Sequence, residues 1–383
     1  MRICFWGTYT IVEGYPVNRV LTKGLRRSGG QLREVREQIW DGFLHAAWKG
    51  SSAALAWRIV RRAIPAYMRL MARFVCMPEC DVVVVGYAGY FDVLVARLLM
   101  AFGRRRPLVL VAFISLYDTV VVDRRQVAPR SWKARMLKRI DAAAFRAADL
   151  VLVDTEAQRR YFARLFALPE ERFQRSFVGE DDEVFRSGSS TRPRPEAGRL
   201  RVLFFGTYVP LHGVEFIIEA AEILKEEEGF EFTLIGNGQQ YARTRSDAAH
   251  RRLDRLQFVS EWVRPSALVD YIEASDICLG IFGTTDKAAR VIPYKVYDAL
   301  AVGRPVVTRD SPAIREILVH EKSALLCPPG DGAALAAALT RLLEDRELRL
   351  DLAARGRETY LQRAAPEAVG RDLLAVLSDR YGC

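Results

Sequence analysis

Short runs of β-branched and aromatic residues alternate with helical patterns along almost the whole chain. In the first half, these strand-like runs cover residues 2–9, 81–86, 107–113 and 149–154. In the second half, they cover residues 199–206, 231–236, 256–259, 276–280 and 305–308. Because parallel strands need a long crossover, usually a helix, this alternation predicts an α/β protein with a parallel sheet in each half.

The chain of 383 residues is longer than one hydrophobic core usually supports, and its charge changes sign near residue 180. Residues 1–178 contain 30 Lys and Arg against 15 Asp and Glu, a net charge of +15, and residues 179–383 contain 27 against 32, a net charge of −5. We therefore expect domains over residues 1–178 and 179–365, followed by a C-terminal helix over 366–383 that packs back on the first domain. The acidic residues 180–183 are expected to form a solvated linker.

Half of the residues are apolar, the mean hydropathy is −0.01, and no uninterrupted apolar run reaches the length of a membrane span. A secretion signal or membrane span is therefore not expected. Six cysteines are scattered, and the two that are close together, Cys76 and Cys80, lie far in sequence from the four histidines, so no zinc-binding spacing is present. This pattern favours a reduced, cytoplasmic protein.

Residues 280–309 read as a strand end, a polar loop, a short helix and a second strand. Pro293 suits the first turn of the helix and Gly303 suits its left-handed end. Lys295 and Asp298 lie three residues apart and so share one face of the helix. The helix N-terminus suits a diphosphate, and a carboxylate one turn later suits ribose hydroxyls. The alternative is a surface helix with an ordinary Lys–Asp ion pair.

Two glycine turns follow strands of the second half. One leads from a strand through a short loop into an amphipathic helix, and the other is a Gly-Asn-Gly turn. Such turns let a phosphate or a base approach the backbone, although a strand–glycine–helix unit is common and such a turn also simply ends a buried strand. The candidate residues for binding a phosphate or a base in these turns are Gly206, Thr207, His212, Gly213, Gly236 and Gly238.

In their order along the chain, these motifs resemble the donor domain of GT-B glycosyltransferases of the family-4 (glycosyl transferases group 1) type, from Val202 to about Tyr360. The first half resembles the partner Rossmann-like acceptor domain less clearly. The resemblance implies two Rossmann-like domains (GT-B) facing each other across a cleft and a nucleotide-diphosphate sugar as donor. We expect no cofactor besides this donor substrate and no metal ion.

The sequence departs from that family at the phosphate-binding positions. Thr207 and His212 stand where the family usually has an Arg and a Lys that grip the donor diphosphate. Arg290 and Asp298 stand where it has two glutamates, the second of which binds the ribose. We therefore expect Asp298 to bind the ribose; the alternative is a chain that has lost catalysis. The cations that we hypothesise to replace the usual phosphate ligands are Lys287, Arg290 and Lys295.

Catalytic groups in the first half are harder to identify. Asp118 follows the strand-like residues 107–113 on the side where ligands bind such sheets, and it is our candidate for orienting or deprotonating the acceptor hydroxyl. A helix or turn cap is the alternative role for Asp118. Gly7 and Gly14 flank the first turn and are candidates on the acceptor side, or they simply form the turn.

Residues 51–74 form an amphipathic helical pattern in which the arginines occupy one side and apolar residues the other. Such a helix suits an anionic membrane surface, whereas the alternative is a core-packed helix whose arginines face water. Nucleic acid is not expected, because stacking aromatics are not interleaved with the cations. The membrane-surface candidates are Arg58, Arg61, Arg62, Arg69 and Arg73.

Together these observations predict a cytoplasmic glycosyltransferase. A peripheral position on the inner face of the cytoplasmic membrane stays open beside a purely cytoplasmic one. It is expected to move a sugar from a nucleotide-diphosphate sugar to a saccharide or lipid-linked acceptor in cell-surface polysaccharide or glycolipid synthesis. The resemblance to the family implies that the transfer occurs with retention. Two alternatives stay open at this stage. One is a nucleotide-sugar epimerase of similar fold, and the other is a non-catalytic nucleotide-sugar-binding module.

Overall fold

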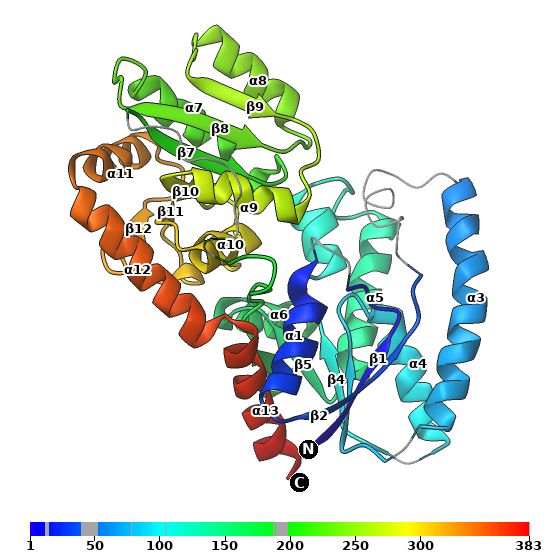
Figure 1. The fold of residues 1–383 in the computed structure, drawn as a ribbon. Helices are drawn as coiled ribbons and strands as arrows, with labels where there is room; N and C mark the ends of the chain where they lie inside the picture. Colours follow the sequence, from blue (N-terminus) through cyan, green and yellow to red (C-terminus); the bar gives the residue numbers. More distant parts are fainter. Residues whose placement is uncertain are drawn as a thin grey trace. The chain divides into compact units, whose positions relative to one another are not determined.

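The computed structural model describes residues 1–11, 15–39, 53–77, 79–103, 105–186, 188 and 198–382, without the side chains of residues 53–56, 58 and 59. Gly14 lies outside the described residues, as does the side chain of Arg58. The chain divides into two compact units (Figure 1). Unit 1 comprises Met1–Val122, Gln126–Val178 and Pro366–Cys383, and unit 2 comprises Asp123–Arg125 and Gly179–Ala365.

Unit 1 contains a six-stranded parallel sheet with the strand order β2-β1-β3-β4-β5-β6. Three of its central strands consist only of buried valine and leucine, as expected for a sheet covered on both faces. The strands are β1 (Arg2–Gly7), β2 (Gln31–Arg36), β3 (Val82–Val85), β4 (Leu108–Val111), β5 (Leu150–Val153) and β6 (Phe173–Arg175).

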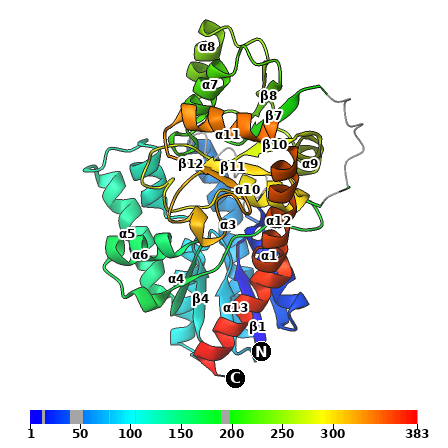
Figure 2. The same cartoon turned by 90° about the vertical axis from the view of Figure 1, so that its left-hand side faces the viewer.

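The helices of unit 1 include the C-terminal helix, which packs against the first helix of the chain (Figure 2). At their crossing, a Cβ on Gly24 would lie 2.0 Å from the carbonyl oxygen of Pro366, so only glycine permits this backbone approach. The helices are α1 (Pro16–Arg27), α3 (Ala53–Val75), α4 (Tyr90–Ala101), α5 (Trp132–Ala147), α6 (Glu156–Phe166) and α13 (Pro366–Tyr381), with the π-helix η1 (Asp118–Asp123) and the 3-10 helix η2 (Glu170–Arg172).

Unit 2 contains a second six-stranded parallel sheet, with the strand order β12-β11-β10-β7-β8-β9. This is the strand order of a dinucleotide-binding Rossmann fold, and the direction of winding reverses between β7 and β10. The strands are β7 (Leu200–Phe205), β8 (Phe230–Ile235), β9 (Leu256–Val259), β10 (Ile277–Leu279), β11 (Val306–Arg309) and β12 (Leu325–Cys327).

The helices of unit 2 include a short helix that starts after Pro293 and ends at Gly303, which has the left-handed φ of 78° expected for a C-terminal cap. The helices are α7 (Val214–Ile223), α8 (Tyr241–His250), α9 (Pro265–Ala274), α10 (Tyr294–Val302), α11 (Gly332–Glu344) and α12 (Arg346–Arg363), with the 3-10 helices η3 (Pro210–His212) and η4 (Ile314–Glu316).

The prediction of an α/β protein with two Rossmann-like domains is confirmed, and all nine expected strands are present. Three strands were not predicted from the sequence, namely β2, β6 and β12. Each of them forms an edge of its sheet. β2 is largely polar and the other two have three residues each, so none produces a clear strand pattern.

Candidate functional site

The candidate site of unit 2 lies where the winding of its sheet reverses, at the carboxyl ends of β7 and β10. Ligands of open α/β sheets bind at such a point because the loops diverge there. Gly206 follows β7 and residues 280–293 follow β10 before α10 begins. The two loops meet, since a Cβ on Gly213 would lie 2.3 Å from the backbone nitrogen of Gly283.

Lys295, in the first turn of α10, points its amine toward the end of β7. Its side chain is only 5% exposed, and its Nζ has no hydrogen-bond partner. The Nζ lies 3.9 Å from the ring centroid of Phe204 and would lie 3.0 Å from a Cβ on Gly206. Burial lowers the pKa of Lys295 well below its usual value, and Asp298 opposes this shift only in part. Burial therefore disfavours the charged form of the amine, and a nearby anion would favour it.

His212 lies beside the same amine, since a Cβ on Gly206 would lie 3.2 Å from its Cε1. Its Nδ1 bonds to the carbonyl oxygen of Thr207, which can only accept, so Nδ1 carries the proton. Burial, and secondarily the charge of Lys295, lower the pKa of His212 well below its usual value. His212, the last residue of η3, is therefore a neutral polar group beside the end of β7, whereas Thr207 is exposed.

The glycines of the Gly-Asn-Gly turn pack against the protein backbone. A Cβ on Gly236 would lie 2.0 Å from the carbonyl oxygen of Gly206, and a Cβ on Gly238 would lie 2.6 Å from the nitrogen of Tyr208. Packing alone therefore accounts for glycine at these two positions. Their predicted contact with a nucleotide stays a prediction.

Lys287 and Arg290 lie in the loop that leads to α10, as expected from their positions in the sequence. Both are largely buried, with 6% and 8% of their surface exposed. The Nε of Arg290 donates to the carbonyl oxygen of Asp286 at 3.0 Å, which anchors this guanidinium within its own loop.

Asp298 is buried rather than on a surface face, so the interpretation of Lys295 and Asp298 as a surface ion pair is wrong. Asp298 is 5% exposed, and its carboxyl group hydrogen-bonds to the carboxyl group of Glu180. Burial, followed by the charge of Glu180, raises the pKa of Asp298 well above its usual value. The prediction of a solvated linker also fails for Glu180 and Asp181, which are 4% and 1% exposed.

In unit 1, Asp118 follows β4 and begins η1, as its predicted place beyond a strand end requires. It is fully buried, and its N–H donates to the Oγ of Ser115 at 3.0 Å. Ser115 in turn donates to Asp141 of α5 at 2.6 Å, and burial raises the pKa of Asp141 to about 6. Sequence analysis missed Asp141; the available signal is a charged residue within an otherwise apolar helix face.

Gly7 ends β1 with a φ of 134°, and a Cβ there would lie 2.5 Å from the Oδ2 of Asp92. Asp92, from α4, accepts hydrogen bonds from the N–H of Thr8 at 2.6 Å and from the hydroxyl of Tyr67 on α3 at 2.5 Å. The turn after β1 is thus fixed by a buried carboxylate, which the sequence analysis also missed.

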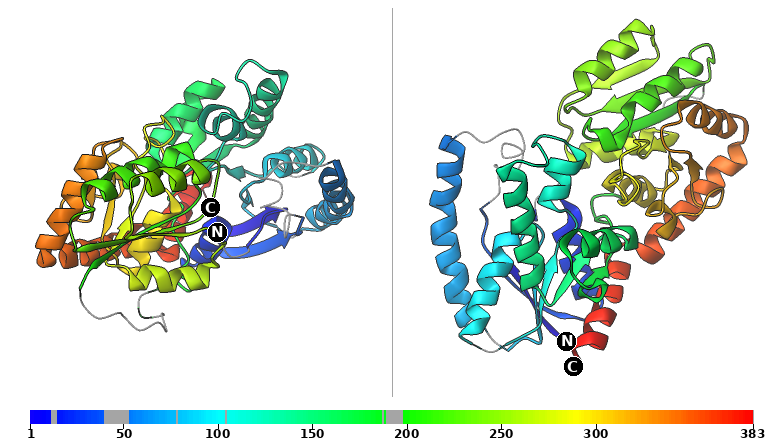
Figure 3. Two further views of the ribbon diagram at one scale, coloured as in Figure 1. Left: turned by 90° about the horizontal axis from the view of Figure 1, so that it is seen from above. Right: turned by 180° about the vertical axis from the view of Figure 1, so that it is seen from behind.

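Helix α3 has three faces, and it lies along the outside of unit 1 (Figures 1 and 3). Leu70 and Ala66 are buried against the unit. A second face, the apolar stripe, is exposed by 64%, 45%, 59% and 62% at Trp57, Val60, Ile64 and Met68. The third face is the exposed arginines Arg61, Arg62, Arg69 and Arg73.

The apolar side of α3 is therefore not simply packed in the core. Ion pairs tie part of its arginine face to the unit, because Arg69 and Arg73 lie 2.7 Å and 3.0 Å from the carboxylate of Glu37. In the part of the chain that the structure describes, no helix has both the length and the apolar character needed to cross a membrane.

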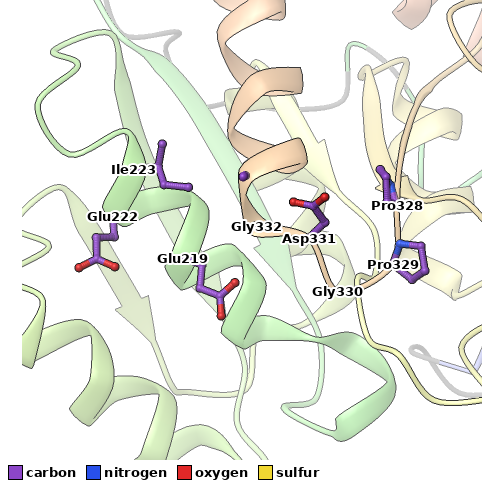
Figure 4. Close-up of a pocket in the computed structure, with 9 residues that line it drawn as sticks. Glu219, Glu222, Ile223, Pro328, Pro329, Gly330, Asp331 and Gly332 are labelled. Carbon is purple, nitrogen blue, oxygen red and sulfur yellow. The ribbon is translucent and has the colours of Figure 1, made fainter.

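A surface pocket of about 550 Å³ lies between α7 and the start of α11 (Figure 4). Its charged lining consists of Glu219, Glu222 and Asp331, which do not suit an anionic ligand. None of the predicted site residues lines it. Among the described residues, no group of three or more histidines, cysteines, aspartates or glutamates is placed to hold a metal ion.

Residues 199–345 match the family described as glycosyl transferases group 1. The chain is 34% identical over 145 residues to the amylovoran biosynthesis glycosyltransferase AmsK of Erwinia amylovora, covering 37% of this chain and 36% of that protein. It is 25% identical over 311 residues to the alpha-D-kanosaminyltransferase of Streptomyces kanamyceticus, covering 77% of this chain and 73% of that protein. The chain thus spans about a third of the one relative and three quarters of the other.

The whole chain is similar in fold to Anabaena Alr3699/HepE, whose structure was solved in complex with UDP. The two share 16% identity with a TM-score of 0.68, and the match covers 99% of this chain and 100% of that one. The expected GT-B fold is therefore confirmed, as is the resemblance to glycosyl transferases group 1 drawn from the order of the motifs.

Proposed function

Because residues 199–345 form a glycosyl transferases group 1 domain within a GT-B fold, we propose that this protein transfers a sugar from a nucleotide-diphosphate sugar to a saccharide or lipid-linked acceptor. The names of the relatives, one of them an amylovoran biosynthesis glycosyltransferase, support cell-surface polysaccharide synthesis as the setting. Transfer proceeds with retention of the anomeric configuration and without a metal ion.

The observation that carries the proposal is the buried amine of Lys295 at the carboxyl end of β7. A buried amine without a hydrogen-bond partner destabilises a protein, so the presence of Lys295 at this position needs a reason. A diphosphate supplies that reason, since it would provide both acceptor oxygens and the negative charge that favours the protonated amine. The N-terminus of α10 adds its partial positive charge at the same place.

The remaining donor contacts follow from the positions of the neighbouring groups. Asp298, one turn after Lys295, accepts hydrogen bonds from the ribose hydroxyls. Lys287 and Arg290 contribute positive charge from the loop before α10. His212 is neutral and therefore acts as a hydrogen-bonding group rather than as a phosphate cation.

On the acceptor side, Asp118 orients or deprotonates the acceptor hydroxyl, and Gly7 shapes the turn after β1. The Ser115–Asp141 pair supports Asp118, because Ser115 bonds to both. An Asp118→Asn variant should lose transfer by about 10²- to 10⁴-fold, the range for a general base, with unchanged donor affinity. Equal loss of donor affinity would contradict this assignment.

The deciding experiment for the function is a panel of nucleotide sugars incubated with the protein and candidate acceptors. Release of the nucleoside diphosphate with formation of a glycosylated product would support the proposal, and Lys295→Ala and Asp298→Ala should weaken donor binding. Epimerised nucleotide sugar without transfer would favour the epimerase alternative. Nucleotide binding without turnover of any sugar would favour a binding module.

We further propose that the protein acts at the inner face of the cytoplasmic membrane, bound through α3. The apolar stripe and the arginine face are both exposed and adjacent, which suits a helix lying in the headgroup region of an anionic leaflet. Flotation with vesicles containing anionic lipid tests this. Absence of binding at moderate salt, or binding that survives Ile64→Glu combined with Met68→Glu, would refute it.

A further inference from the structure

The hydrogen bond between Asp298 and Glu180 joins the proposed donor site to the segment through which the chain enters unit 2. Glu180 is the second residue of unit 2 in this segment, which begins at Gly179. Both carboxyl groups are buried, with 5% and 4% of the residue surface exposed. The Oδ1 of Asp298 is buried without a hydrogen-bond partner.

Glu180 is also held by the segment through which the chain leaves unit 2. The hydroxyl of Tyr360 donates to the carbonyl oxygen of Glu180 at 2.9 Å, and the N–H of Glu180 donates to the carbonyl oxygen of Ala364 at 3.4 Å. Its Oε1 accepts the N–H of Asp181 at 2.8 Å. Glu180 therefore contacts both ends of unit 2 and helix α10 at once.

Two buried carboxyl groups joined by a hydrogen bond must hold a proton between them, because two carboxylates repel and neither can donate. The groups around the pair do not remove this need. Lys295 is the cation whose charge reaches Asp298, and burial itself disfavours the protonated amine. Two further ionisable groups interact with the pair: the Cys278 thiol with Asp298, and the Tyr360 hydroxyl with both Asp298 and Glu180. Asp181 and Asp182 face the same Tyr360 hydroxyl.

We propose that Glu180 is a positioning residue for the donor site, which shares one proton with Asp298 and thereby fixes α10 against the entry segment of unit 2. In this arrangement the carboxyl group of Glu180 hydrogen-bonds to one carboxyl oxygen of Asp298. The other oxygen, Oδ1, is left to bind the ribose. The donor-binding part of this inference rests on the proposed function. The shared proton itself does not.

A pH dependence follows from the shared proton. Burial and Glu180 raise the pKa of Asp298 in the folded protein above its value in the unfolded chain. The stabilising contribution is therefore fully present below the unfolded-state pKa and is lost as the pH rises through the folded-state pKa. At higher pH the pair becomes a repelling dianion beside the site of an anionic donor, so donor affinity should fall in the same pH range.

The variant Glu180→Gln tests this, because an amide donates to Asp298 without needing a proton. We expect the Tm of the ligand-free wild type to fall as the pH rises through the midpoint at which the Asp298–Glu180 pair loses its shared proton. The plot of Tm against pH should be flatter for Glu180→Gln. Glu183→Gln is the matched control from the same acidic segment, since Glu183 is exposed, and it should follow the wild type. Asp298→Asn should flatten the Tm curve as well and serves if the first variant does not fold.

Titration with UDP, measured at each pH, tests the positioning role. We expect the wild type to lose at least about tenfold in affinity across the midpoint, whereas Glu180→Gln should change by less than about threefold. Parallel Tm curves for the wild type and Glu180→Gln would overturn the shared proton. Parallel affinity curves would overturn the positioning role. A flattened Tm curve without binding of UDP or other nucleotides would instead overturn the proposed function and leave the shared proton standing.

Discussion

Replacement of Lys295 by methionine should change stability and donor binding in opposite directions. Methionine is unbranched and apolar, and it fills the space beside Phe204 without a polar atom that needs a partner. A buried polar group without a hydrogen bond costs about 1–3 kcal/mol, so Lys295→Met should raise the free energy of unfolding of unit 2 by about that amount. For a unit of this size, each kcal/mol raises the Tm by about 2–4 °C.

The same substitution removes the proposed phosphate ligand. A charge-assisted hydrogen bond contributes about 1.5–3 kcal/mol, which corresponds to an affinity change of roughly 10- to 150-fold. Part of this energy is offset because burial disfavours the charged amine and lowers the pKa of Lys295. We therefore expect the lower end of that range, a weakening of UDP binding by about tenfold.

Thermal unfolding and calorimetric titration with UDP, performed on the same preparations, measure both effects. Lys322→Met is the matched control, since Lys322 is exposed in unit 2 and should change neither quantity. A Lys295→Met variant that is less stable than the wild type and binds UDP equally well would refute the reasoning, because the amine would then serve the fold and not the donor.

Further predictions concern the metal dependence of the reaction and the effects of single substitutions. Transfer activity should persist in excess EDTA, and its loss with recovery on adding a divalent cation would contradict a metal-independent reaction. Gly213→Ala should lower the Tm, because its φ is 62° and its Cβ would meet a backbone nitrogen at 2.3 Å, whereas Gly29→Ala, with a φ of 86° in open space, should lower it less. Leu70→Ala should destabilise unit 1 by about 2–5 kcal/mol in denaturant unfolding. Arg290→Ala should weaken donor binding; if it did not while Asp298→Ala did, the hypothesis of compensating cations would be wrong.

The central strands of both units were predictable from the sequence, because buried parallel strands are short apolar runs that end in glycine or polar turns. The reversal of winding in unit 2 became visible only with the strand order. Edge strands such as β2 were missed, because one side of an edge strand has no partner strand and its residues can be polar. The helix from Tyr294 to Val302 was predictable from the residues at its ends.

The burial of the charged side chains in the candidate site, and the partners that they contact, were not predictable from local sequence patterns. Lys295 and Asp298 look like a surface pair by spacing, whereas the structure buries Lys295 beside Phe204 of β7 and Asp298 beside Glu180 of the entry segment. Glu180 stands among other acidic residues that suggest solvent exposure. Its contacts with Tyr360 and Asp298 join positions that are more than 100 residues apart in the sequence, which no spacing rule covers.

The three faces of α3 decide how a membrane experiment on this protein must be interpreted. Tyr67 donates to Asp92 at 2.5 Å, and the same carboxylate accepts the N–H of Thr8 at 2.6 Å, so a change at Tyr67 also disturbs the turn after β1. Leu70 is buried, and its truncation acts through stability. Substitutions in the apolar stripe, such as Ile64→Glu, change an exposed side chain and leave both contacts in place. The stripe variants therefore separate loss of membrane binding from loss of the fold or of the acceptor-side turn, whereas variants of Tyr67 or Leu70 do not.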